Sequence, residues 1–229
     1  MRRRIELSAV WSGAGMGVLT LVGMVIVGRF IPPFMDPSDT AAQVAAKYAD
    51  RIDSVRIGLV IGTVGLTLIL PFGIAIAAQV RESEPGPPIL TYVGLASTAV
   101  ATVFVVLACA VWAIAAYRPG DLPAHDVRLA NDAAYILFIF TYPPFSVWFV
   151  SIALAIFADD RERPVFPRWV AYLNLWLALL IAAGALVIFF HTGAFAYNGL
   201  LSLYVPVTAF FVWVVAMTVV MLRNVQPSG

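Results

Sequence analysis

The side chains best suited to chemistry in this sequence are an adjacent amide and carboxylate, Asn131 and Asp132, at the edge of a long apolar run. Arg128 lies four residues before Asp132, a spacing that predicts an ion pair on one face of a helix. A carboxylic acid that keeps its proton at neutral pH can protonate a substrate. We therefore take Asp132 as the candidate catalytic acid, with Asn131 and Arg128 as the residues that orient it.

The same positions also have a structural interpretation. Asn131 is a favoured N-cap residue for a helix that begins there, and Asp132 in the first turn would suit the helix dipole. Asn198 is a comparable N-cap candidate for the last helix, and His191 suits a helix C-terminus. From the sequence, capping and a shared functional pocket both remain open.

Further polar and aromatic side chains fall near the same ends of the apolar runs or along their interior. The aromatic rings among them would suit a lipophilic polycyclic or isoprenoid ligand, because aromatic faces stabilise cationic carbon. The candidate substrate-binding residues are Arg56, Trp112, Tyr135, Phe138, Tyr142, His191, Asn198, Tyr204 and Trp213. The alternative for the aromatic residues is ordinary packing between helices.

No cofactor and no metal site is expected. The single cysteine, Cys109, allows neither an internal disulfide nor a thiolate metal site. The two histidines, His125 and His191, are too few for most metal or haem clusters, and only a bis-histidine haem is left as an alternative. The only lysine, Lys47, lies outside the apolar runs, which excludes a retinal Schiff base. Walker, dinucleotide-binding, HExxH and GxSxG motifs are absent from the sequence.

The composition defines the elements that must position these residues. Of the 229 residues, 62% are hydrophobic and 12% are charged, about half the charged fraction of a soluble domain. The mean hydropathy is +0.92. A net charge of +1 makes nucleic acid an unsuitable partner. We therefore expect an all-α, polytopic membrane protein that forms one transmembrane domain over residues 1–229, with membrane lipid as its surroundings.

A helix needs about 20 apolar residues to cross a bilayer, and the sequence predicts six such spans. They cover residues 8–30, 55–80, 89–117, 131–158, 168–191 and 198–223. With the N-terminus inside, eight arginines lie in cytoplasmic segments against five arginines and one lysine outside, and residues 2–4 are all arginine. We expect a multi-pass protein of the bacterial inner membrane with both termini in the cytoplasm.

The loop between the first two spans is predicted to contain an amphipathic helix over residues 37–53. Asp36 would be its N-cap, with Pro37 at the first helical position. Val44, Tyr48 and Ile52 recur at helical spacing and would form its apolar face. The helix either joins the two spans along the membrane surface or covers a cavity as a lid.

Prolines predict irregular helices in the second, fourth and sixth spans, at Pro71, Pro143, Pro144 and Pro206. Each proline leaves one backbone carbonyl without its helical hydrogen bond. Such a carbonyl is tolerated in a bilayer only where it is buried in protein or lines a cavity. Broken helices therefore favour an internal cavity, and simple kinking is the alternative.

Three stretches carry a resemblance to a known family: residues 128–132 (RLAND), 164–176 (PVFPRWVAYLNLW) and 189–201 (FFHTGAFAYNGLL). With them, the chain resembles a family of small six-helix bacterial integral membrane proteins. In size and layout it is also similar to membrane-embedded bacterial terpene cyclases. That resemblance implies a helical bundle that folds a prenyl chain and starts cyclisation by protonation with a carboxylic acid.

The sequence thus favours binding and conversion of a lipophilic small molecule, most concretely an isoprenoid protonated by a carboxylic acid. Two other classes remain open: a non-enzymatic membrane subunit or scaffold, and a small-solute channel or carrier. Glycines at 13 and 17, and at 58 and 62, form small-residue faces that suit close packing in the bundle or in a homodimer.

Overall fold

The computed structural model describes residues 1–118 and 120–225, and over this part of the chain it contains helices and no strands. Six helices are long and apolar enough to span a membrane, which confirms the all-α class and indicates a multi-pass membrane protein. They are Arg3–Val27, Ile52–Ser83, Ile89–Tyr117, Ala124–Phe157, Arg168–Phe189 and Leu200–Val225.

Five of these six helices are interrupted. In chain order the elements are α1 (Arg2–Thr20), η1 (Leu21–Val27), α2 (Ala41–Asp50), α3 (Ile52–Thr67), α4 (Ile69–Ser83), α5 (Ile89–Tyr117), α6 (Ala124–Phe140), α7 (Tyr142–Phe157), α8 (Arg168–Ala182), η2 (Ala183–Phe189), η3 (Leu200–Tyr204) and α9 (Val205–Val225). Segments η1 and η3 are π-helical and η2 is a 3₁₀-helix. Only α5 crosses the described bundle without a break.

The prolines explain three of the interruptions, as the sequence predicted. Pro71 lies in the first turn of α4, Pro143 and Pro144 open α7, and Pro206 lies at the start of α9. The π-helical η1 and the 3₁₀-helical η2 contain no proline and were not predicted. Each contains a glycine at a tight contact, Gly23 in η1 and Gly184 in η2.

The short helix in the first loop differs from its predicted bounds. It covers Ala41–Asp50 and its N-cap is Thr40, not Asp36, because Thr40 and Gln43 form a reciprocal capping box. Arg51 has a non-helical backbone, so the segment after it already belongs to α3. Val44 and Tyr48 are buried, as their spacing predicted.

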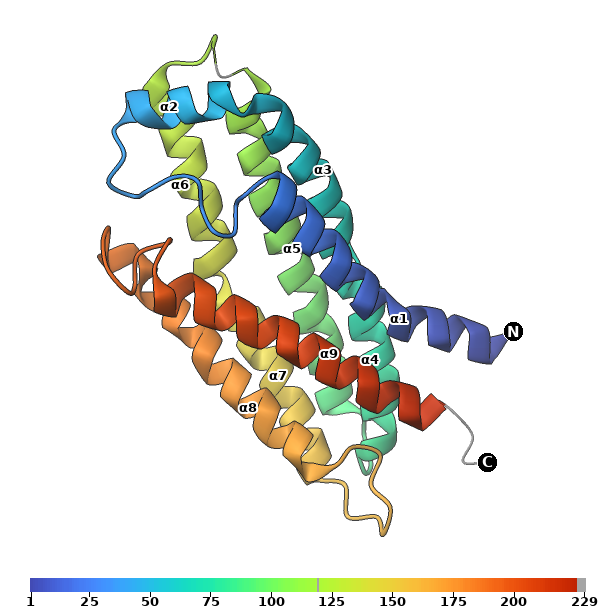
Figure 1. The fold of residues 1–229 in the computed structure, drawn as a ribbon. Helices are drawn as coiled ribbons and strands as arrows, with labels where there is room; N and C mark the ends of the chain where they lie inside the picture. Colours follow the sequence, from blue (N-terminus) through green and yellow to red (C-terminus); the bar gives the residue numbers. More distant parts are fainter. Residues whose placement is uncertain (119, 226–229) are drawn as a thin grey trace.

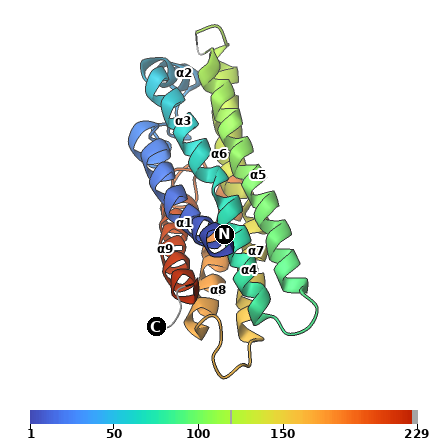
Figure 2. The ribbon, with the colours of Figure 1, turned by 90° about the vertical axis from the view of Figure 1, so that its right-hand side faces the viewer.

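Helix α2 lies across one end of the bundle, which we call the α2 end (Figure 1). The start of α1 and the end of α9 lie away from it, and α1 packs beside α9 (Figures 1 and 2). At the opposite end Asp159 fixes the loop between α7 and α8. Hydrogen bonds from the Arg161 guanidinium, at 2.7 Å, hold the pKa of Asp159 at about 2.

An aromatic cluster forms the core between α4, α7 and α9. The ring of Trp213 lies 4.9 Å from Phe149, 5.2 Å from Trp148 and 5.9 Å from Phe72. Its indole N–H donates to Asn174 Oδ1 at 3.0 Å, which ties α9 to α8. Trp213 is therefore fully buried and hydrogen-bonded within the packing core.

The contact between η1 and α3 brings their backbones close together, and it depends on glycine. A Cβ on Gly23 would lie 2.3 Å from the backbone nitrogen of Gly62 and 2.7 Å from the carbonyl oxygen of Gly58. Because both neighbours are backbone atoms, neither can move without shifting its helix.

We predict that Gly23→Ala lowers the free energy of unfolding by about 1–3 kcal/mol, the usual effect of overpacking. Gly120→Ala is the matched control, because no atom lies within 4 Å of a Cβ at that position. Thermal or denaturant unfolding in detergent checks both variants. Equal stability of Gly23→Ala and the wild type would contradict this packing.

Candidate functional site

The predicted catalytic residues form part of a polar network at the α2 end. Asn131 is completely buried on α6 and donates its amide to Asp132 Oδ1 at 3.2 Å. The Tyr48 hydroxyl donates to Asn131 Oδ1 at 3.1 Å, and the Asn131 amide also reaches the Tyr197 hydroxyl at 3.5 Å. Arg128 Nε lies 3.6 Å from Asp132 Oδ2, which confirms the expected i,i+4 pair. Asn131 is therefore the centre of the network.

The network places the carboxylate at its edge. The Asp132 side chain is 33% exposed and that of Arg128 is 40% exposed. Tyr48 and Asn131, by contrast, are fully buried. A group approaching from the α2 end can therefore reach Asp132 but not the Tyr48 hydroxyl, whose pKa is raised by burial.

Aromatic rings continue from the polar network towards the middle of the bundle. Tyr135 stacks on Tyr197 with ring centroids 4.3 Å apart, and its hydroxyl donates to the Phe30 carbonyl at 3.3 Å. The ring of Trp112 lies 4.8 Å from Tyr135 and 5.7 Å from Phe138. These packed rings fill the space between Asn131 and the level of Phe138.

The two polar loops at the α2 end are bonded to one another. Asn198 donates its amide to Asp36 Oδ2 at 2.9 Å, which links the loop before α2 to the loop before η3. The pKa of Asp36 is lowered because Ser38 donates both its hydroxyl and its backbone N–H to the carboxylate. Lys47 on α2 pairs with Asp39 in the same loop.

The capping interpretation of Asn131 and Asn198 is wrong. Helix α6 begins at Ala124, earlier than predicted, so Asn131 and Asp132 lie within it and not at its start. The last helix begins at Leu200 with Gly199 as its N-cap, and Asn198 bonds Asp36 instead. Both amides thus serve tertiary contacts, which sequence spacing could not distinguish from caps.

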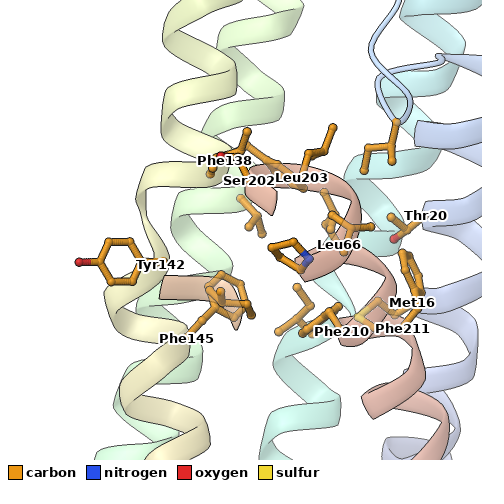
Figure 3. Close-up of a pocket in the computed structure, with 17 residues that line it drawn as sticks. Met16, Thr20, Leu66, Phe138, Tyr142, Phe145, Ser202, Leu203, Phe210 and Phe211 are labelled. Atoms are coloured by element: carbon orange, nitrogen blue, oxygen red, sulfur yellow. The ribbon is translucent and has the colours of Figure 1, made fainter. Parts of the chain in front are cut away.

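A separate cavity lies in the middle of the bundle, and we call it the mid-bundle cavity (Figure 3). The centres of water-sized molecules can occupy about 100 Å³ of it, and its space free of protein atoms amounts to about 750 Å³ only when the opening to the surroundings is included. Its walls are formed by Met16, Thr20, Ile31, Leu66, Ile69, Val105, Phe138, Ile139, Tyr142, Phe145, Ile181, Ser202, Leu203, Pro206, Val207, Phe210 and Phe211.

Many of the lining residues lie beside the points where helices are interrupted. Thr20 lies where α1 passes into η1, and Leu66 and Ile69 flank the break at Leu68. The same holds for the three later interruptions. Phe138, Ile139 and Tyr142 flank Thr141, Ile181 precedes η2, and Ser202, Leu203 and Pro206 surround the junction of η3 with α9. The cavity therefore follows from local backbone irregularity in five helices.

The lining is almost entirely apolar. Four phenylalanines contribute to it, and Figure 3 shows Phe145 and Phe210 beside the space. The Tyr142 oxygen points away from the other lining residues in Figure 3. The Ser202 hydroxyl is used by the protein, because it donates to the Phe195 carbonyl at 2.7 Å.

The structure divides the predicted substrate-binding residues between several places. Phe138 and Tyr142 line the mid-bundle cavity. Tyr135, Trp112 and Asn198 belong to the α2 end, as described above. Arg56 donates to the carbonyls of Ala116 and Tyr117 and so closes the C-terminus of α5. The remaining three are His191, exposed in the loop before η3; Tyr204, half-buried at the end of η3; and Trp213, in the aromatic core.

Sequence reasoning did not include Tyr48, Tyr197 or Thr20 in a site. Tyr48 was placed correctly on the buried face of its helix, and a buried tyrosine usually needs a partner for its hydroxyl. That requirement was the signal available for including Tyr48, although it does not identify Asn131 as the partner. Tyr197 lies in the loop before η3, where no helical spacing relates it to Asn131, and Thr20 gave no signal because η1 was not predicted.

Within residues 1–118 and 120–225, no group of three or more His, Cys, Asp or Glu side chains lies together as a metal ion would require. Comparison with protein-family models, curated proteins and solved structures finds no match to this chain.

The buried hydrogen bond between Tyr48 and Asn131 should hold α2 on the bundle. We predict that a cysteine at Val44, which is buried, reacts slowly with a water-soluble thiol reagent, whereas a cysteine at Ala46, which is exposed, reacts fast. Adding Tyr48→Phe should accelerate labelling at position 44 about five- to thirtyfold, because losing the bond costs about 1–2 kcal/mol.

The natural Cys109 is buried and provides the background rate in the unmodified chain. Fast labelling at position 44 in the presence of Tyr48 would show that α2 is not held on the bundle.

Proposed function

We propose that this protein is an integral membrane protein that binds a lipophilic small molecule in the mid-bundle cavity. The observation that carries the proposal is the cavity, whose walls are apolar and aromatic. Moving an apolar ligand from water into such a site is favourable in proportion to the area it buries. A site for a polar solute would need several converging polar groups, and the lining contains only Thr20, Tyr142 and Ser202 as residues with side-chain oxygen.

Entry from the lipid is part of the same proposal. Val207, Phe210 and Phe211 line the cavity and are half-buried, so the wall formed by α9 is partly accessible from outside the bundle. Neighbouring outward positions on α9, such as Val212 and Val215, are exposed and apolar, which suits contact with acyl chains. A lipophilic ligand could therefore reach the cavity without crossing water.

For orientation, we propose that the chain lies in a bacterial inner membrane with both termini in the cytoplasm. Arginines support this: eight lie at or near the ends of spans on the side of the termini, against five arginines and Lys47 on the α2 side. In this arrangement α2 lies on the outer face as an amphipathic helix, with Tyr48 and Val44 towards the bundle.

Conversion of the ligand is a second proposal, favoured by the contacts of Asp132 with Asn131 and Arg128. In its most concrete form the protein is a terpene-cyclase-like enzyme, and Asp132 protonates an isoprenoid. Asp132 precedes Phe138 by six residues on α6, which is about 9 Å along a helix axis. A general acid must come within hydrogen-bond reach of its substrate. Cyclisation therefore needs a substrate that extends from the cavity to the α2 end, whereas binding needs only the cavity.

The cavity also bears on the two non-enzymatic alternatives. A channel for polar solutes requires polar groups along its path, and the apolar lining favours ligand binding over that function. A structural subunit would copurify with a partner protein in fixed proportion and would need no cavity.

We predict that Val207→Phe reduces the amount of apolar compound that copurifies with the protein by about tenfold, the effect of losing 1.4 kcal/mol of binding. The added ring would occupy the cavity that Val207 lines. Val215→Phe is the matched control, because Val215 is 63% exposed on the same helix and lies outside the lining.

Solvent extraction followed by mass spectrometry measures the compound. The proposal would be overturned if wild type and both variants carried the same compounds in the proportions found in the surrounding bilayer.

For the enzymatic proposal, we predict that Asp132→Asn lowers turnover of a prenylated substrate about a hundredfold or more, the low end of general-acid contributions. Asparagine keeps the size and hydrogen-bonding oxygen of the side chain, so the melting temperature should change little. Asp126→Asn is the control, since Asp126 is an exposed carboxylate in the first turn of α6. Unchanged turnover together with a lower melting temperature would assign Asp132 a structural role only.

A further inference from the structure

The side-chain oxygens in the lining of the mid-bundle cavity are used by the protein or turned away from the space. Ser202 donates its hydroxyl to the Phe195 carbonyl at 2.7 Å, and the Tyr142 oxygen points away from the other lining residues (Figure 3). The Thr20 hydroxyl oxygen has less than 1 Å² of accessible surface, and a Cβ on Gly65 of α3 would lie 2.9 Å from it. Among the described residues, no side chain of the lining therefore offers a hydrogen bond to a ligand.

A polar group inside this cavity would lose its hydrogen bonds to water and gain none from the side chains around it. Burying a hydroxyl without a partner is costly. A hydrocarbon segment meets no such cost, and Phe138, Phe145 and Phe210 give it an aromatic wall. The part of a ligand that lies within the cavity is thus hydrocarbon.

The enclosed space is small compared with a long lipophilic molecule. The centres of water-sized molecules can occupy about 100 Å³ of it, whereas an apolar cavity of about 150 Å³ in another protein binds a single benzene. A long ligand can therefore place only its end inside. The rest must continue through the opening, and the wall formed by Val207, Phe210 and Phe211 is partly accessible from outside the bundle.

The cavity lies at the depth where hydrocarbon chains end in a bilayer. Leu66 and Ile69 lie on either side of the middle of the span Ile52–Ser83, and Val105 lies near the middle of the next span, Ile89–Tyr117. The hydrocarbon core of a bilayer is about 30 Å thick, so its middle lies about 15 Å from either surface. A long chain covers that distance while its polar head stays at the surface.

We propose that the ligand is a long-chain amphiphile that inserts the end of its hydrocarbon chain into the mid-bundle cavity and keeps its polar head outside the bundle. This proposal rests on the proposed function and narrows it, because it excludes ligands whose polar group enters the cavity. A fatty-acyl chain and a prenyl chain share this chemistry, and the experiment includes both.

The test compares palmitic acid with ω-hydroxypalmitic acid, which differ only in a hydroxyl at the chain end. Dissociation constants are measured by calorimetry in detergent for wild type, Val207→Thr and Val215→Thr. Threonine is close to valine in size, so Val207→Thr adds a hydrogen-bonding group to the lining. Val215→Thr is the matched control, because it adds the same group at an exposed position outside the lining. The ratio of the two constants is compared between variants, so unequal partition of the acids into detergent cancels.

We expect the chain-end hydroxyl to weaken binding to the wild type about tenfold or more, after correction for the partition of each acid into empty micelles. Val207→Thr should reduce this penalty about three- to tenfold, which is the effect of one neutral hydrogen bond. Val215→Thr should leave the penalty unchanged. Equal binding of the two acids to the wild type would overturn the proposal, and so would a ratio that Val207→Thr does not change.

Naphthalene, which has no polar head, separates this proposal from the function on which it rests. If naphthalene binds the wild type, Val207→Phe weakens its binding and no long-chain acid competes with it, the proposed function stands and this proposal fails. If none of the probes binds, both fail. Competition by palmitic acid supports an acyl chain as the ligand, and competition by farnesylacetic acid alone supports a prenyl chain.

Discussion

A helix that loses backbone hydrogen bonds in apolar surroundings must deform or find new partners for the freed groups, and this constraint shapes the middle of the bundle. Pro71, Pro143 and Pro206 each lie at a helix junction, and glycines mark the two interruptions without proline. At these points the helices change direction or pitch and cannot pack as continuous cylinders. Residues beside all five interruptions line one cavity.

The α2 end follows a different rule, because Asn131, the buried polar side chain at its centre, is hydrogen-bonded through both its oxygen and its amide nitrogen. Asn131 uses its oxygen for Tyr48 and its amide for Asp132 and Tyr197, so three segments distant in the chain meet at one side chain. Packed rings of Trp112 and Tyr135 separate this network from the cavity. Asp132 and the mid-bundle cavity therefore lie at different depths in the bundle. For this reason the geometry supports ligand binding in the cavity more directly than protonation of the ligand by Asp132.

The sequence predicted the features that depend on local pattern. Apolar run length predicted the long helices, proline positions predicted three interruptions, and Arg128 was correctly paired with Asp132. It failed where a polar residue had two local interpretations: Asn131 and Asn198 match N-cap preferences but make long-range bonds. The partition of the predicted pocket into a polar network and a cavity depends on which rings pack between them, and residue spacing carries no information about that.

The central claim is that a lipophilic molecule occupies the space where the helices are interrupted. An experimental density map of the protein, purified in mild detergent from the membrane in which it is made, tests it most directly. The account predicts continuous non-protein density between α1, α6 and α9, in contact with Phe138 and Phe210. A map in which α1 and α9 close on one another, or in which the cavity is present and empty, would contradict it.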